Sequence, residues 1–224
     1  MALLHDYGPA LLQGLLITLL LSVSSWIAAF VISLALTMLR MTRIRVLEFL
    51  VLAFIEYQRN VPPLVHLFIW YFGVSSLLAF DMQDWINAHN GEFIFAVIAI
   101  GLYYGAYFAE DIRSGMRSIP RGQYEAARAI GLSYAGTLRR VILPQALRVA
   151  IPPMVSGSVM LVKTSSLAMV IGVMELTYVT KDIASDTFQI FEAYGISTAM
   201  YVVVALCILF FGSWLSQRLQ IKGR

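Results

Sequence analysis

Charged residues are scarce in this sequence. Asp, Glu, Lys and Arg make up 13% of its 224 residues, while hydrophobic residues make up 59%. A soluble globular domain normally carries about 25% charge. The apolar residues also occur in long blocks, and a block of about 20 apolar residues is typical of a membrane helix. The composition therefore excludes an ordinary soluble protein. It predicts an all-α polytopic membrane protein with a single domain, residues 1–224.

Cysteine and histidine are also rare. Cys207 is the only cysteine, so an internal disulfide is excluded. The histidines His5, His66 and His89 are far apart and lack the spacing of metal ligands, so no metal site is predicted. The N-terminal segment MALLHDYGPA lacks Lys and Arg, which a cleaved signal peptide needs, so the first apolar block is expected to remain as a span.

The apolar blocks predict about five transmembrane helices. The expected spans are residues 11–39, 50–78, 93–111, 151–174 and 195–215. The second is interrupted by EYQRNVPP, where Pro62 and Pro63 predict a break or a kink. Two interpretations stay open at this point. Residues 61–80 cross alone while 46–60 lie at the inner surface, or one long kinked helix places Arg59 near the middle of the membrane.

Basic residues are almost absent from one side of the predicted membrane. The short loops on the other side and the C-terminus hold thirteen of the sixteen Lys and Arg: Arg40, Arg43, Arg45, Arg113, Arg117, Arg121, Arg128, Arg139, Arg140, Arg148, Arg218, Lys222 and Arg224. The opposite segments contain only Lys181 and are rich in Asp and Glu. The positive-inside rule therefore predicts a periplasmic N-terminus and a cytoplasmic C-terminus. It also explains the pI near 9.1 without nucleic-acid binding.

Residues 118–145 form a polar segment between the third and fourth spans, on the predicted cytoplasmic side. Pro120 suits the start of a helix, Gly131 its left-handed C-terminal cap, and Ser133 the N-cap of the next helix. We expect that second helix to end at Leu143, because Pro144 disfavours a helical residue before it. One face of it is predicted to be apolar, formed by Tyr134, Leu138, Val141 and Ile142.

This segment resembles the EAA loop of bacterial ABC importer permeases. The matching residues are Glu125, Ala126, Ala127, Gly131, Val141, Leu143 and Pro144. The family usually has Ile where this chain has Val141. The segments LLQGLLITLLLSV, YQRNVPPLVHLFIWYFG, YFAEDIRSGMRSIPRGQYEAARAIGLS and LVKTSSLAMVIGVMELT are similar to the polar amino acid subfamily, the histidine/glutamine/glutamate-type permeases. The resemblance covers residues 10–217.

The resemblance implies a type I importer fold and a coupling role for the EAA loop. In that family the loop docks on a cytoplasmic ABC ATPase dimer, which binds ATP and Mg. This chain lacks a G-x-x-x-x-G-K-[ST] phosphate loop, so it is expected to bind no cofactor and to be no enzyme by itself. The other partners implied are a second permease subunit, identical or paralogous, a periplasmic amino acid-binding protein, and the amino acid itself. The implied location is the bacterial inner membrane.

Two sets of ionisable residues are candidates for function within the membrane. Lys163, Thr164, Ser165 and Ser166 lie inside the fourth span, where a charge is costly unless it is used or paired. Lys163 is a candidate for meeting a substrate carboxylate, or else for a structural ion pair in the complex. Arg59 carries the same two interpretations.

Glu110 and Arg113 are three residues apart at a helix end, so they either pair with each other or take part in gating. Two other functions stay open as well. One is an intramembrane enzyme with a Ser–Lys pair, and the other is an ion-coupled transporter or channel. The sequence does not identify the amino acid.

Overall fold

The computed structural model describes residues 2–42 and 44–219, and all its regular elements are helices. In chain order they are α1 (Ala2–Met41), α2 (Arg45–Asn60), α3 (Pro63–Phe68), α4 (Phe80–Ala88), α5 (Gly91–Arg117), α6 (Arg121–Ala129), α7 (Tyr134–Thr137), α8 (Leu143–Ser165), α9 (Leu176–Thr187) and α10 (Ile190–Leu219). Wide π-helical turns at Ile69–Val74 and Leu138–Ile142 continue α3 and α7, and a 3₁₀ turn at Ser166–Ile171 continues α8. Arg43, Lys222 and Arg224 of the predicted basic side lie outside the described residues.

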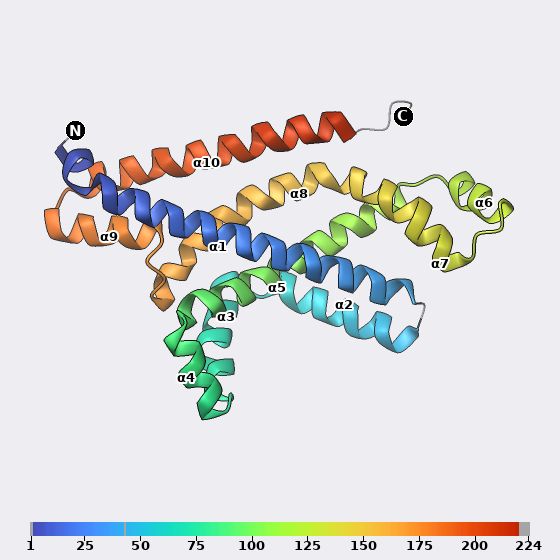
Figure 1. The fold of residues 1–224 in the computed structure, drawn as a ribbon, viewed down its shortest axis with the longest axis horizontal. Coiled ribbons are helices and arrows are strands. Elements are labelled where there is room, and N and C mark those ends of the chain that lie inside the picture. The colour runs from blue at the N-terminus through green and yellow to red at the C-terminus, as the bar shows by residue number, and fades with distance from the viewer. Residues whose placement is uncertain (1, 43, 220–224) are drawn as a thin grey trace.

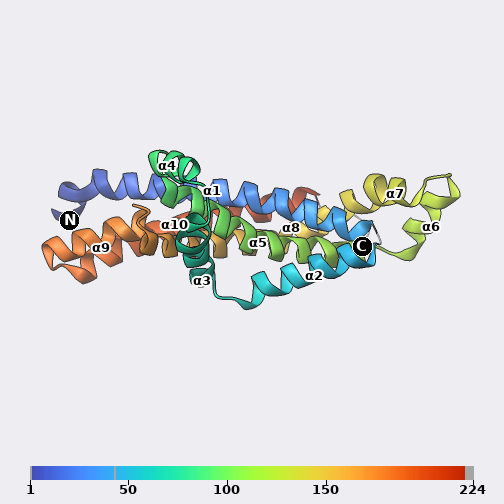
Figure 2. The ribbon, with the colours of Figure 1, turned by 90° about the horizontal axis from the view of Figure 1, so that it is seen from below.

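The molecule is an elongated bundle whose long helices follow its long axis (Figure 1). The N-terminus and α9 lie at one end, and α6 and α7 lie at the other (Figures 1 and 2). Four helical stretches in the described part of the chain are long and apolar enough to span a membrane: Leu3–Met41, Gly91–Arg117, Tyr134–Ile171 and Ile190–Leu219. They contain or overlap four of the five predicted spans.

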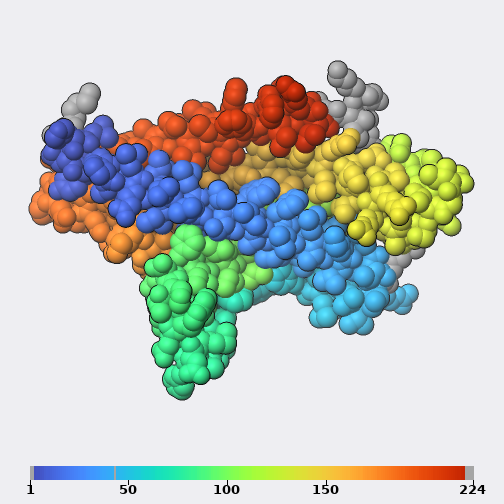
Figure 3. Space-filling model, in the orientation of Figure 1, coloured from blue at the N-terminus to red at the C-terminus, as the bar shows by residue number. Residues whose placement is uncertain are grey.

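The second predicted span, residues 50–78, is divided rather than continuous. Helix α2 ends at Asn60, Val61 is extended, and Pro62 and Pro63 begin α3. Proline lacks the N–H that a continuing helix needs, and it disfavours a helical residue before it. Helix α3 then turns away from the bundle axis and projects sideways together with α4 (Figures 1 and 3). The single kinked helix is therefore wrong. The crossing by residues 61–80 stays a prediction, and the apolar helix in that segment covers Pro63–Val74.

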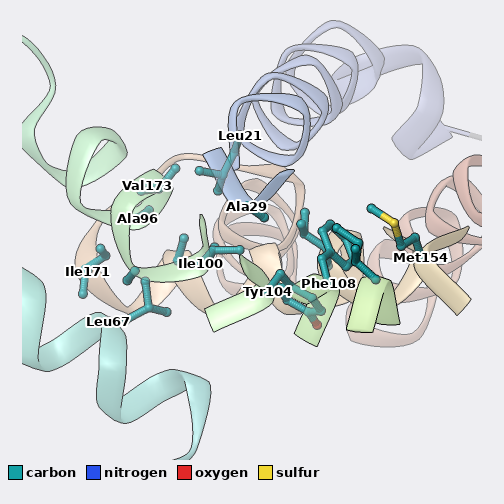
Figure 4. Close-up of a cluster of buried hydrophobic side chains, with 14 of the residues drawn as sticks. Leu21, Ala29, Leu67, Ala96, Ile100, Tyr104, Phe108, Met154, Ile171 and Val173 are labelled. Carbon is teal, nitrogen blue, oxygen red and sulfur yellow. The ribbon is translucent and has the colours of Figure 1, made fainter. Parts of the chain in front are cut away.

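The core lies where α5 packs against α1 and α8. Gly101 and Gly105 face α1 so closely that a Cβ added to them would lie 2.8 Å from Ala28 Cβ and 2.7 Å from Ile32 Cγ2. Small residues four apart allow this close approach between membrane helices. Phe108, which is fully buried, lies in the core with Tyr104 and Met154 (Figure 4).

The sequence predicted that the helix after Ser133 would end at Leu143, and this prediction is wrong. The helix continues from α7 through the π-helical turn into α8, and the N–H of Leu143 donates to the carbonyl of Leu138 five residues earlier. Pro144 is the second residue after this wide turn. A π turn loosens the regular i to i−4 bonding that a proline would disrupt, so the chain keeps its direction. The fourth apolar stretch therefore begins well before residue 151.

Candidate functional site

The turn between α6 and α7 is held by a complete set of capping bonds. Gly131 has φ +85°, the left-handed conformation predicted for it. Its N–H donates to the carbonyl of Arg128 at 3.0 Å, and the N–H of Leu132 donates to that of Ala127 at 3.2 Å. These two bonds define a Schellman motif. Ser133 then caps α7, because its hydroxyl accepts from the N–H of Gly136 at 3.1 Å. The two predicted helices and the capped turn between them are therefore present.

The EAA residues lie on the outer part of this turn. Glu125 and Ala126 are exposed, while Ala127 is buried. Sequence reasoning missed Ile130, which ends α6 with 78% of its surface exposed, beside Gly131. The signal was an apolar residue next to the cap glycine of a short polar helix. An exposed apolar tip on a polar helix is suited to contact another protein.

The other face of the turn is fixed to the bundle. Leu138 and Ile142 are buried with Ile119, and Val141 and Tyr124 pack partly against them. Leu143 belongs to the central core, whereas Pro144 is exposed. Tyr134 belongs to the predicted apolar face but is 41% exposed, so it lies only at the edge of that face. A force applied to α6 would therefore reach the helices of the core through packed side chains.

A second polar cluster lies at the end of α8, where the helix tightens from α to 3₁₀ at Ser166. The hydroxyls of Thr164 and Tyr104 are 2.7 Å apart and join α8 to α5. Ser165 is fully buried, and the hydroxyl of Ser22 in α1 donates to its Oγ at 3.4 Å. The helix therefore changes type within the predicted polar cluster, directly after Ser165.

Arg59 reaches the same cluster from α2. Its guanidinium lies 5.3 Å from the ring centre of Tyr107, and the Tyr107 hydroxyl donates to its carbonyl at 3.4 Å. The ring centres of Tyr104 and Tyr107 are 6.1 Å apart. The tyrosines of α5 therefore bring Arg59 and Thr164 onto one surface. Sequence reasoning did not single out these tyrosines, although Tyr103, Tyr104 and Tyr107 fall on neighbouring helical positions.

Lys163 is exposed on this chain beside Thr164. Among the residues that the structure describes, no carboxylate forms an ion pair with it. The hydroxyls of Ser165 and Ser166 donate to the backbone carbonyls of Val162 and Lys163. They are engaged with the backbone, and the geometry gives no support to a Ser–Lys catalytic pair.

Glu110 and Arg113 do pair, with Nη1 of Arg113 3.3 Å from Oε1 of Glu110. A third residue joins them: Nη1 of Arg40 in α1 is 2.6 Å from the same oxygen. The Arg40 side chain is 12% exposed and that of Glu110 is 26% exposed, so the pair is partly shielded from water. It links α1 to α5 at the basic end of the bundle. A gating role for it stays a prediction.

A bundle of long apolar helices that carries a capped polar turn at one end fits a membrane transport subunit. The chain belongs to the family of binding-protein-dependent transport system inner membrane components, whose model matches residues 16–221. The resemblance to ABC importer permeases is thereby confirmed.

Similar proteins and a similar solved structure support this family assignment. The chain is 32% identical to a probable glutamine ABC transporter permease, GlnM of Bacillus subtilis, over 98% of this chain and 97% of that protein. It is 31% identical to the glutamate/aspartate import permease GltJ of Escherichia coli, over 94% of this chain and 87% of that protein. A crystal structure of an amino acid ABC transporter with histidines is similar with a TM-score of 0.84, 29% identity and 96% coverage of both chains. The expected importer fold is confirmed.

Proposed function

We propose that this chain is the permease subunit of an ABC importer that carries polar amino acids across the bacterial inner membrane. The observation that carries the proposal is the capped α6–α7 turn, with exposed Glu125, Ala126 and Ile130 on one side and packed core helices on the other. Such a turn can transmit the motion of a partner to the bundle. The named relatives, which are amino acid permeases, support the substrate class.

The energy comes from a separate ATPase subunit in this proposal. The sequence has no phosphate-binding loop, so ATP and Mg bind to the partner. The basic end of the bundle, with α6 and α7, faces the cytoplasm, and the end with α9 faces the periplasm. Membership of a binding-protein-dependent family leaves a passive channel or an ion-coupled transporter without support.

The transport path is completed by a second permease subunit. Lys163 is exposed on this chain although it lies within the apolar stretch Tyr134–Ile171, where a charge facing lipid is costly, and Arg59 is exposed near the end of α2. A second subunit, identical or paralogous, would enclose them in a polar passage between the two. There Lys163 meets the substrate carboxylate, and the tyrosine hydroxyls of α5 and Thr164 supply further hydrogen bonds. Alternating access then needs only rigid-body movement around this central site.

Uptake by reconstituted complexes tests the proposal. Liposomes would contain this chain with its ATPase and second permease subunit, with ATP and Mg inside the compartment that the ATPase faces. We expect uptake of one or more amino acids from a panel of twenty, only with ATP and only with the binding protein present. Uptake without the ATPase, or uptake driven by an ion gradient, would refute an ABC importer.

A further inference from the structure

A groove opens between the end of α1 and the segment that joins α7 to α8, at the end of the bundle that carries the α6–α7 turn (Figure 1). It has a volume of about 490 Å³, and sites for small molecules usually have about 300–1,000 Å³. The proposed substrate path and the exposed face of α6 lie outside it. The residues that line the groove are Met38, Met41, Thr42, Ala135, Leu138, Arg139 and Leu143.

The π-helical turn at Leu138–Ile142 shapes the apolar floor of the groove. The N–H of Leu143 donates to the carbonyl of Leu138 across this turn. Residues five apart point in different directions on a regular α-helix, which has about 3.6 residues per turn, whereas a wider turn brings them onto one side. Leu138 is 4% exposed and Leu143 is 9% exposed, so both lie deep in the groove. Wide turns of this kind are frequent at functional sites.

Methionine forms the wall that α1 contributes. Met38 is 54% exposed, and Met41 packs partly against Ile119 and Leu138. A methionine side chain has three rotatable bonds and adjusts to ligands of irregular shape. On the opposite wall Ala135 is small and exposed, so the groove stays open on that side. These walls suit a flexible hydrocarbon chain better than a rigid polar ligand.

Arg139 gives the groove a positive charge. It is exposed, and within the described part of the chain it forms no ion pair. The described residues of the lining include no Asp or Glu. Arg40, which directly precedes Met41 in α1, is by contrast paired with Glu110. The groove therefore combines an apolar floor with an unpaired cation, and a ligand that matches it joins an apolar chain to an anionic group.

The groove lies at one boundary of the membrane-spanning helices. Met41 ends the apolar stretch Leu3–Met41, and Tyr134 begins the apolar stretch Tyr134–Ile171. Basic and aromatic residues at the ends of such stretches are typical of the headgroup level of a bilayer. Helix α6 projects beyond the end of α1, whereas α7 lies beside it (Figures 1 and 2). Lipid can therefore reach the groove while α6 remains free for the ATPase.

We propose that this groove binds an anionic phospholipid of the cytoplasmic leaflet. An acyl chain lies against Leu138, Leu143 and Met38, and the headgroup phosphate pairs with the guanidinium of Arg139, whose fork of N–H groups matches phosphate oxygens. Basic pockets between transmembrane helices on the cytoplasmic side suit anionic headgroups. The inference rests on the proposed function for the orientation of this end. The bound lipid would fasten α7 to the end of α1 and so steady the segment that carries the α6–α7 turn.

Photolabelling of the purified importer complex tests this site. Nanodiscs would contain phosphatidylglycerol or phosphatidylcholine with a photoactivatable diazirine on the acyl chain, and labelled peptides would be identified by mass spectrometry. We expect phosphatidylglycerol to label the peptides around Met38 and Leu138 about fivefold more than phosphatidylcholine does. Unlabelled phosphatidylglycerol should compete, and inorganic phosphate should not. Equal labelling by the two lipids, competition by inorganic phosphate, or no label in these peptides would overturn the site.

Matched variants separate recognition of the headgroup from a general effect of charge. Arg139→Gln should lower labelling by phosphatidylglycerol about fivefold and leave labelling by phosphatidylcholine unchanged. Arg148→Gln removes an exposed arginine of α8 outside the groove and should change neither. Ala135→Phe adds a ring to the groove wall and should lower labelling by both lipids. Unaltered labelling in both Arg139→Gln and Ala135→Phe would contradict the proposal. So would labelling that appears only when the second permease subunit is absent, because that subunit would then cover the groove.

Failure of this site and failure of the proposed function are distinguishable. Photolabelling requires the assembled complex but no transport, so its pattern decides the lipid site alone. A wild-type complex that shows the expected labelling but no ATP-driven uptake would refute the importer and support the lipid site. A complex with ATP-driven uptake and no label in the groove would do the reverse.

Discussion

Valine at position 131 is expected to reduce ATP-driven uptake at least tenfold while the permease still inserts in the membrane. Gly131 has φ +85°, and a β-branched residue is strongly disfavoured there. The cost of about 1–2 kcal/mol for an L-residue in this region is enough to shift the turn away from its capped geometry. The bonds from Gly131 and Leu132 to the end of α6 would then be lost, and Ile130 and Glu125 would no longer be held in place.

Two substitutions control for effects unrelated to this conformation. Gly131→Asn should retain most uptake, because asparagine tolerates the left-handed region. Gly122→Val should do the same, since an added Cβ there meets nothing within 4 Å and the backbone is helical. Glu125→Lys reverses the charge on the exposed face of α6, and we expect it to lower stimulated ATP hydrolysis and uptake together. Wild-type rates in both Gly131→Val and Glu125→Lys would exclude the turn as the transmission element.

Lys163→Met is expected to lower uptake at least tenfold for every substrate that the wild type carries, with the complex still assembled. Every α-amino acid has the carboxylate that Lys163 would meet, so the loss should not depend on the substrate side chain. A tenfold loss corresponds to about 1.4 kcal/mol, less than the 2–5 kcal/mol typical of removing one member of a buried charge pair. Thr164→Val, which removes the bond to Tyr104, should give a smaller loss of the same kind.

Uptake and assembled complex would be measured on the same preparations, with Lys181→Met as the matched control at an exposed lysine of α9. Unchanged uptake in Lys163→Met and Thr164→Val would eliminate this site. Loss of the assembled complex would instead favour an ion pair between Lys163 and another subunit.

Hydropathy and turn chemistry were sufficient to predict the larger features of this fold. The long apolar blocks became α1, α5, α8 and α10, since burial in lipid depends on local composition. The cap at Gly131 and the N-cap at Ser133 also followed from local rules, because each depends on one residue and its immediate neighbours.

Features that depend on tertiary packing could not be predicted in this way. The proline rule predicted a helix end at Leu143, but the π-helical turn before Pro144 let the helix continue. The same rule correctly predicted a break at Pro62 but not that α3 would turn out of the bundle. Arg40 joined the Glu110–Arg113 pair from a helix some 70 positions earlier in the chain, and Tyr104 and Tyr107 gained their polar partners from α8 and α2. No local pattern contains such pairings.

Cross-linking between α6 and the ATPase tests the central claim most directly, namely that this turn couples the membrane helices to a separate motor. A single cysteine would be placed at Ala126, which is exposed on α6, in a Cys207→Ser background, and a second variant would carry it at Asp84 on α4. A short thiol-to-amine cross-linker is then applied to active complexes. The account predicts an adduct with the ATPase subunit from position 126, a yield that changes when ATP is hydrolysed, and none from position 84. Full uptake activity without any ATPase adduct from position 126 would contradict it.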